Sequence, residues 1–596
     1  MSTHRKLAAV WLCFFALPLA IFGQNTGDQK NHRSARIDSI YSQGMIALRR
    51  GDLVSARVAF EKAVRLAPRS PEAHNSLGWV LLAQGQLEPA IPHFQTALQL
   101  KPDFPQAHIN LSNALVQRGD LEGALRESRE SVRLAPMDSE AHRTLGRALS
   151  FVGDLDAAAN ELRRAVDLEP ARADLHDELG SLLAQQSRLD DAATEFSKAL
   201  RLQPEFAQAH FHLGVLRLQQ KSSEEALAHL QAAIHLNPQS AQAHYYLGQA
   251  LEDKGDRDAA IRELQASVKL QPDFPEAQNQ LGLLLQRFGN AEDAVAAFRR
   301  LVQLQPEDPD AHNNLGLALI QLGQADSSIP EFQAALRLRP NDSGYEGNLG
   351  VAYLQKADFD SAIAQFQSAL KTTPQDATLH YNLGLALKLK DRLADAMAEL
   401  RKAAELDPGQ ADAHYTLGVT LWQQGEFAEA ADELRAAIHA KPDYAEAYYT
   451  LGTVLKQQGR LQEAANALRE AIRLQPDFAG AHTTLAAVLR QQGDTARAKA
   501  ETLAAEEITK SKTSLQAATF ATNSGARLLN AGDLEGAIGQ FQAAIKLAPT
   551  YAPAHYHLAV ALQRKGQHKE AQGEFQKAAE LDPRLKPSGN SGAPPK

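Results

Sequence analysis

Residues 71–104 read PEAHNSLGWVLLAQGQLEPAIPHFQTALQLKPDF, and this stretch decides the fold. Apolar residues recur in it at spacings of three, four and seven, such as the step from Leu77 to Leu81, which is the pattern of an amphipathic helix. Gly85 separates two such runs, and Pro102 follows the second. Because proline lacks an N–H donor and clashes with the preceding turn, it ends a helix. The stretch therefore predicts two short helices joined by a tight turn.

The same pattern recurs with a period of 34 residues along the chain. When the first unit is numbered from Ile37, proline occupies position 32 of thirteen consecutive units, and position 8 carries only glycine, serine or alanine. A glycine inside a helix costs roughly 0.5–1 kcal/mol relative to alanine, so its recurrence indicates a close helix crossing with room only for a small side chain. A lone helix pair cannot bury its apolar face, so the units must stack into an array.

Composition supports an array of small aliphatic helices and excludes some partners. The chain has 596 residues, of which 44% are hydrophobic, 22% charged and only 6% aromatic. This length exceeds what one compact core accommodates. The formal net charge of −9 provides no positive field to attract phosphates. We therefore expect no nucleic-acid partner.

The repeat resembles the tetratricopeptide repeat family over about residues 37–585. The resemblance rests on the small residue at position 8, alanine at position 20 with Ser328 as the exception, alanine or serine at position 27 with Leu301 as the exception, and proline at position 32. It implies an all-α fold: a right-handed superhelical α-solenoid of about 16 helix-turn-helix repeats with a concave groove lined by the first helices. The repeats are also similar to the superhelical array of O-GlcNAc transferase. Only a short tail follows Pro583, so we expect no catalytic domain like that of the transferase.

Breaks in the pattern suggest five segments. We expect a signal peptide at 1–23, a flexible segment at 24–36, repeats 1–14 at 37–512, repeats 15 and 16 at 513–585, and a disordered tail at 586–596. Repeat 14 lacks its terminal proline, and the next marks, Gly525 and Pro549, come five residues late. The sequence from Thr495 to about Lys512 is rich in Ala, Glu and Lys, which favours a lengthened second helix in repeat 14. A linker is the alternative.

The first residues have the order of a secretory signal. Arg5 and Lys6 precede an apolar run over residues 7–22, which is short of the ~20 residues that a membrane span needs. We expect cleavage near Gly23 and export to the periplasm or the medium. An uncleaved anchor through residues 7–22 is the alternative and would be the only membrane contact. Because Cys13 is the only cysteine, the mature chain is expected to lack disulfides and Cys-ligated metals.

Histidine occupies position 4 in eleven units, namely His74, His108, His142, His176, His210, His244, His312, His380, His414, His482 and His555. Equivalent positions in successive repeats should lie about 10 Å apart, whereas metal ligands must approach one ion to ~2.1 Å. We therefore expect structural packing and no metal or cofactor, with metal or proton chemistry as the alternative. No phosphate loop, zinc-protease motif or nucleophile elbow occurs in the sequence, which disfavours an enzyme.

The candidate binding residues lie on the first helices of repeats 9–14. They are the position-6 residues Asn314, Asn348 and Asn382, the position-5 residues Tyr381, Tyr415 and Tyr449, and the residues Trp422, Lys388, Lys456 and Arg490 on the same inferred inner face. An amide both donates and accepts, so it can pair with any extended backbone, and the resemblance to the transferase array implies that role at position 6. Tyrosine supplies contact area at low entropic cost. Ordinary packing between repeats is the alternative for the whole cluster.

The sequence thus predicts an exported, non-catalytic scaffold that binds proteins or peptides in a concave groove. The alternative is a tetratricopeptide component of a polysaccharide or cell-envelope export or assembly machine, and an enzyme is the third reading. The pattern indicates neither the identity of the partner nor an oligomeric state.

Overall fold

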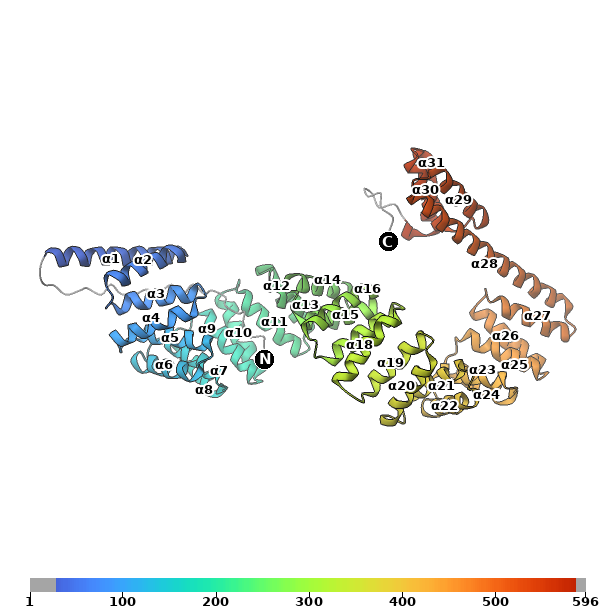
Figure 1. Cartoon of the computed structure of the whole chain (residues 1–596), viewed down its shortest axis with the longest axis horizontal. Helices are drawn as coiled ribbons and strands as arrows, with labels where there is room; N and C mark the ends of the chain where they lie inside the picture. The colour runs from blue at the N-terminus through green and yellow to red at the C-terminus, as the bar shows by residue number, and fades with distance from the viewer. Residues whose placement is uncertain (1–27, 586–596) are drawn as a thin grey trace. The chain divides into compact units, whose positions relative to one another are not determined.

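The computed structural model describes residues 28–585, which are helical throughout apart from short turns and contain no strand (Figure 1). The prediction of an all-α array of stacked helix pairs is confirmed. The expected signal peptide at 1–23 and the tail at 586–596 lie outside the described residues. Of the expected flexible segment at 24–36, residues 28–36 form the start of the first helix. This start is favourable because no glycine or proline interrupts the sequence before Gly44.

The chain divides into two compact units, and the first ends at Leu304. It contains repeats 1–8, in which each odd-numbered helix is the first of its pair, here called helix A, and each even-numbered helix is the second, helix B. The helices are α1 (Asp28–Arg49), α2 (Leu53–Leu66), α3 (Pro71–Ala83), α4 (Leu87–Leu100), α5 (Pro105–Arg118), α6 (Leu121–Leu134), α7 (Ser139–Phe151), α8 (Leu155–Leu168), α9 (Ala173–Gln185), α10 (Leu189–Leu202), α11 (Ala207–Gln219), α12 (Ser223–Leu236), α13 (Ala241–Lys254), α14 (Arg257–Leu270), α15 (Pro275–Phe288) and α16 (Ala291–Leu304).

The second unit begins at Gln305 and contains repeats 9–16. Its helices are α17 (Pro309–Gln321), α18 (Ala325–Leu338), α19 (Ser343–Gln355), α20 (Phe359–Thr372), α21 (Ala377–Leu389), α22 (Leu393–Leu406), α23 (Ala411–Gln423), α24 (Phe427–Ala440), α25 (Ala445–Gln457), α26 (Leu461–Leu474), α27 (Ala479–Gln491), α28 (Thr495–Asn530), α29 (Leu534–Leu547), α30 (Ala552–Arg564) and α31 (His568–Leu581), followed by a 3-10 turn at Pro583–Leu585.

Position 8 is the point of closest approach within each helix pair. A Cβ atom added to Gly316 on α17 would lie 2.6 Å from Cε1 of Phe332 on α18, and one added to Gly78 on α3 would lie 2.8 Å from Cε1 of Phe94 on α4. Both phenylalanines are fully buried. The recurring small residue is therefore a packing requirement, as the sequence indicates, and it fixes the distance between helices A and B.

Neighbouring A helices lie closer to each other than neighbouring B helices do. Within the first unit α3 contacts α5, α5 contacts α7 and α9 contacts α11, and within the second unit the same holds from α17 to α27. Within the described residues of either unit, no two consecutive B helices approach as extensively. Since the side with the shorter spacing must be the inner side of a bend, the A helices form the inner side of each unit. We call this surface the A-helix face.

Helix α28 differs from the expected boundary between residues 512 and 513. It runs without a break for 36 residues, from Thr495 to Asn530, so it is both helix B of repeat 14 and helix A of repeat 15. Its first part packs on α27 and its last part on α29 (Figure 1). The five extra residues lengthen one helix because the segment contains no proline and no glycine before Gly525, and therefore nothing that would end the helix.

Candidate functional site

Side chains at two positions connect the A helices of successive repeats. Position 5 of one repeat meets position 6 of the next, 35 residues later. Asn110 Nδ2 donates a hydrogen bond to Asn75 Oδ1 at 2.9 Å, and the hydroxyl groups of Tyr41 and Ser76 lie 2.8 Å apart. The same relation holds for Asp177 with His212, Asn313 with Asn348, Phe211 with Tyr246, and Tyr381 with Thr416. These positions therefore contribute to cohesion between repeats.

Repeats 4 and 5 contain the strongest version of this contact. Arg143 is only 6% exposed and binds Glu178 of the next repeat through Nε and Nη2. Asp174 lies 3.5 Å and Glu140 3.4 Å from its Nη1 atom. Burial alone would lower the pKa of Arg143, but the three carboxylates outweigh it and raise that pKa. This part of the A-helix face is occupied by its own ion pairs.

The three candidate asparagines fall into two groups. Asn348 on α19 donates to Asn313 Oδ1 at 2.8 Å, and the half-buried Asn314 on α17 also has an interaction of its own. Asn382 on α21 makes no hydrogen bond from its amide within the described residues. The reason is visible one repeat earlier, where position 5 is Gly347 and offers no side chain. Asn382 is therefore the candidate amide that remains available to a ligand.

Two of the three candidate tyrosines pack against the turn that precedes the next repeat. The ring of Tyr415 lies 4.9 Å from that of Tyr444, and the ring of Tyr449 lies 4.7 Å from that of Phe478. Tyr381 has no such aromatic neighbour, because Gln410 occupies the corresponding position. Burial raises the pKa of Tyr381, although its hydrogen bond to Thr416 acts to lower that pKa. Tyr415 and Tyr449 thus have a structural role beside any contact with a ligand.

Position 12 of helices α21, α23, α25 and α27 carries the remaining candidates. Trp422 Nε1 donates to Gln457 Oε1 at 2.6 Å, and Arg490 Nη2 donates to Thr502 Oγ1 at 3.3 Å. Lys388 and Lys456 are half-buried, and within the described residues neither they nor Arg490 forms an ion pair. Burial lowers the pKa of Lys388. Repeats 11, 13 and 14 therefore carry cations at one shared position of the A-helix face without neutralising carboxylates.

The ladder of position-4 histidines belongs to a contact that the sequence analysis missed. In nine repeats the histidine Nδ1 atom meets a glutamate 19 residues later on helix B, as in His142 with Glu161 at 2.6 Å. In eight of these repeats Nε2 also meets the carbonyl oxygen of the proline that ends the preceding repeat, as in Pro136 at 3.0 Å. The five repeats without this histidine also lack an acidic residue or histidine 19 positions later. The joint presence of a histidine at position 4 and an acidic residue or histidine 19 residues later is therefore a signal in the sequence that could have predicted this contact. We call the contact the position-4 clamp.

Histidine replaces the glutamate in two position-4 clamps. His74 meets His93 in repeat 2, and His210 meets His229 in repeat 6, with Nδ1 atoms 3.0 Å apart in both cases. Within residues 35–585 no cluster of three or more His, Cys, Asp or Glu side chains is arranged for a metal ion.

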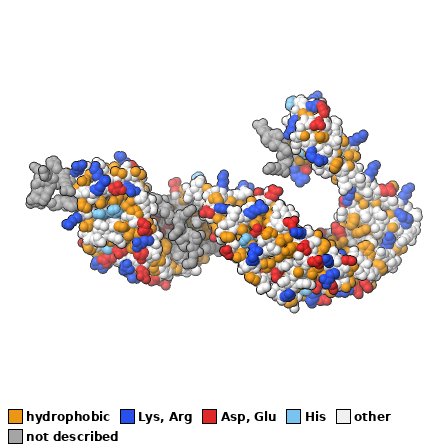
Figure 2. Space-filling model, in the orientation of Figure 1, with side chains coloured by type: hydrophobic (Ala, Val, Ile, Leu, Met, Phe, Trp, Pro, Cys, Tyr) orange, Lys and Arg blue, Asp and Glu red, His pale blue; other side chains and the backbone are white. Residues whose placement is uncertain are grey.

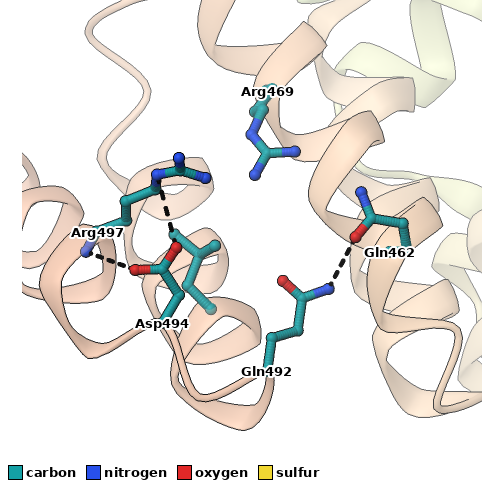
Figure 3. Close-up of a pocket in the computed structure, with 6 residues that line it drawn as sticks. Gln462, Arg469, Gln492, Asp494 and Arg497 are labelled. Atoms are coloured by element: carbon teal, nitrogen blue, oxygen red, sulfur yellow. Dashed lines mark hydrogen bonds and ion pairs between the residues drawn. The ribbon is translucent and has the colours of Figure 1, made fainter.

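An open depression of about 690 Å³ has none of the candidate residues in its lining. It is lined by Gln462, Arg469, Leu489, Gln492, Asp494 and Arg497, from α26, α27 and the start of α28 (Figure 3). Its polar side chains pair largely with one another, since Arg497 binds Asp494 at 3.5 Å and Gln492 binds Gln462 at 3.4 Å. On the face shown in Figure 2, acidic and basic side chains are interspersed. None of the described helices is both long and apolar enough to span a bilayer.

Stacked helix pairs with a 34-residue period define a helical-repeat protein of the solenoid class. Models of the tetratricopeptide repeat match residues 41–105, 81–148, 143–204, 178–241, 222–275, 246–286, 279–343, 348–411, 393–445, 415–477, 449–511, 525–566 and 552–585. The chain belongs to the tetratricopeptide repeat family. Residues 512–524, in the middle of α28, match none of these models.

Several solved structures are similar to this chain. A crystal structure of MamA is 30% identical, with 28% of this chain and 96% of that chain covered and a TM-score of 0.27. YrrB, described as a TPR protein with an unusual peptide-binding site, is 24% identical, with 31% and 96% covered and a TM-score of 0.28. Yeast Tom70 is 18% identical, with 73% and 95% covered and a TM-score of 0.32. The comparison with curated proteins finds no match.

Proposed function

We propose that this protein is an exported, non-catalytic scaffold that binds an extended acidic segment of a partner protein along the A-helix face of repeats 10–14. The observation that carries the proposal is the coincidence of an unengaged amide and unpaired cations on the A helices of repeats 11, 13 and 14. Asn382 lacks a partner because of Gly347, and Lys388, Lys456 and Arg490 lack carboxylates within the described residues. A rigid array binds such a segment without an ordering cost of its own.

The spacing of the cations suggests how an extended chain would run. Neighbouring helices pack about 10 Å apart, and an extended chain advances about 3.3 Å per residue, so one repeat corresponds to about three ligand residues. Lys388 and Lys456 are two repeats apart, and Arg490 follows one repeat later. A matching ligand therefore carries acidic side chains about six and then about three residues apart.

The test uses defined peptides rather than an unknown partner. One fluorescein-labelled peptide of about 15 residues has glutamates at this spacing, and a scrambled peptide of equal composition has them clustered. Fluorescence polarisation should show tighter binding of the spaced peptide, weakened by salt because the contacts are charged. The triple variant Lys388→Ala, Lys456→Ala, Arg490→Ala should bind the spaced peptide at least ten times more weakly.

A matched control removes three cations from helices B instead. Arg337, Lys371 and Lys546 lie on α18, α20 and α29 and form no ion pair within the described residues. The control triple variant should bind as the native chain does. Equal binding of spaced and scrambled peptides, or equal losses in the two triple variants, would show that the A-helix face of repeats 10–14 is not the binding surface.

Export is supported by the order of Arg5, Lys6 and the apolar run at 7–22. Mass spectrometry of the exported fraction should find a new amino terminus near Gln24. An intact Met1 in that fraction would contradict cleavage and favour an anchored chain.

A further inference from the structure

The two position-4 clamps made of histidine pairs have the same local geometry. In repeat 2 the rings of His74 and His93 lie 5.3 Å apart at 36°, and in repeat 6 the rings of His210 and His229 lie 5.3 Å apart at 37°. Both pairs join a helix A to its own helix B. The separation that excludes a metal between successive repeats therefore does not apply to them.

Both first histidines have their protonation fixed by the backbone. His74 Nε2 lies 3.1 Å from the carbonyl oxygen of Pro68, and His210 Nε2 lies 3.1 Å from that of Pro204. Because a carbonyl oxygen only accepts, the proton of the first histidine is on Nε2, and its Nδ1 atom accepts a hydrogen bond from the Nδ1–H of the second histidine. An ion bound between the two Nδ1 atoms replaces this proton, so the second histidine then carries its proton on Nε2. An N–H bonded to a backbone carbonyl is the outer contact that usually orients a metal-binding histidine.

The distance between the two Nδ1 atoms indicates which ions fit. Two nitrogens 3.0 Å apart that both lie about 2.0–2.1 Å from one ion subtend about 95° at that ion. This is close to the right angle between neighbouring ligands of a square-planar or tetragonal site, which Cu²⁺ and Ni²⁺ prefer, and it is smaller than the tetrahedral angle of a structural zinc site.

We propose that the His74–His93 and His210–His229 pairs each bind one tetragonal divalent cation, Cu²⁺ or Ni²⁺, through their two Nδ1 atoms, with water in the remaining positions. His93 and His229 are partly exposed, so the ion and its waters can reach each site. The nine clamps with glutamate offer a carboxylate in place of the second imidazole.

Copper titration of the full chain without a histidine tag tests this proposal. The native chain should bind two more equivalents of Cu²⁺ than the double variant His93→Glu, His229→Glu, and each single variant should lose one. Glutamate is the residue that the other clamps use, so these variants should keep the fold, which circular dichroism checks. Electron paramagnetic resonance of the two lost equivalents should show two coordinating nitrogens. Copper that binds elsewhere on the chain binds equally to both proteins, so it does not affect the difference in stoichiometry between them.

A gain-of-site variant provides the reciprocal test. Glu127→His converts the clamp of His108, whose Nδ1 atom lies 2.7 Å from Glu127, into a histidine pair. It should bind one further equivalent of Cu²⁺ with the same resonance signature. Equal stoichiometry of the native chain and the double variant, or a nitrogen signature that does not change when the pairs are removed, would overturn the proposal.

Discussion

Repeats 4–5 and repeats 10–11 use the same two positions of their A helices for different purposes. In repeats 4–5, Arg143 at position 5 is buried against Glu178 at position 6 of the next repeat. In repeats 10–11, Gly347 at position 5 leaves Asn382 at position 6 without a partner. The difference shows that position 5 decides whether position 6 of the next repeat holds the array together or remains available for a ligand.

The largest expected effect is on stability, from Arg143→Ala. The substitution leaves Glu140, Asp174 and Glu178 close together without their shared cation, and breaking a buried ion pair in this way costs about 3–5 kcal/mol. Chemical denaturation should show a loss of this size, with hydrogen exchange increased first in α7 and α9.

Arg460→Ala is the matched control for that prediction. Arg460 and Glu463 form an exposed pair at 2.6 Å, and such pairs contribute about 0–1 kcal/mol. If Arg143→Ala costs no more than Arg460→Ala, the ion pairs of repeats 4–5 are not what holds these A helices together.

The second prediction concerns Gly347→Asn, which places a side chain at the position that leaves Asn382 without a partner. The amide introduced at residue 347 would lie relative to Asn382 as Asn313 lies relative to Asn348, and it should form a hydrogen bond with Asn382. A Cβ atom at residue 347 would lie 2.9 Å from Cδ2 of Leu379, so that side chain must shift. Binding of the spaced acidic peptide should fall by roughly fivefold, about 1 kcal/mol, because the amide of Asn382 is then engaged.

The control for this prediction is Gly344→Ala, one turn earlier on α19, where an added Cβ atom meets only Asp342 Oδ1 at 3.2 Å. It should leave peptide binding unchanged. Full binding by Gly347→Asn, with the fold intact by circular dichroism, would contradict the idea that Asn382 is available because Gly347 has no side chain.

The smallest expected effect comes from Asn382→Ala, which removes an amide without a partner. Surface changes of this kind alter the stability by about 0.5 kcal/mol or less, while peptide affinity should fall by roughly fivefold, about the worth of one hydrogen bond. Asn348→Ala should show the opposite pattern, because it leaves Asn313 unpaired: about 1 kcal/mol of stability is lost and binding hardly changes. Chemical denaturation and fluorescence polarisation should be measured on both variants. A large loss of stability in Asn382→Ala, or a large loss of peptide binding in Asn348→Ala, would contradict the prediction.

The sequence predicted the helix pairs because their signals are local. Periodic apolar residues, the proline at position 32 and the glycine at position 8 each act within one repeat or on its immediate neighbour. The availability of Asn382 was not predictable from position 6 alone, because it depends on Gly347, 35 residues earlier. Likewise, Tyr415 and Tyr449 look like free anchors until Tyr444 and Phe478 are placed beside them.

The long helix α28 has a mechanical consequence. Between Ala505 and Ala518, both buried, its residues are mostly exposed, so this stretch is held mainly by its own backbone hydrogen bonds. Helices of that length without packing are marginally stable in water. Transient melting here separates no packed surfaces, whereas the other repeats of the second unit pack directly on their neighbours. Proteases should therefore cut here first, and the two halves of the helix should be able to swivel while the repeats on either side stay folded.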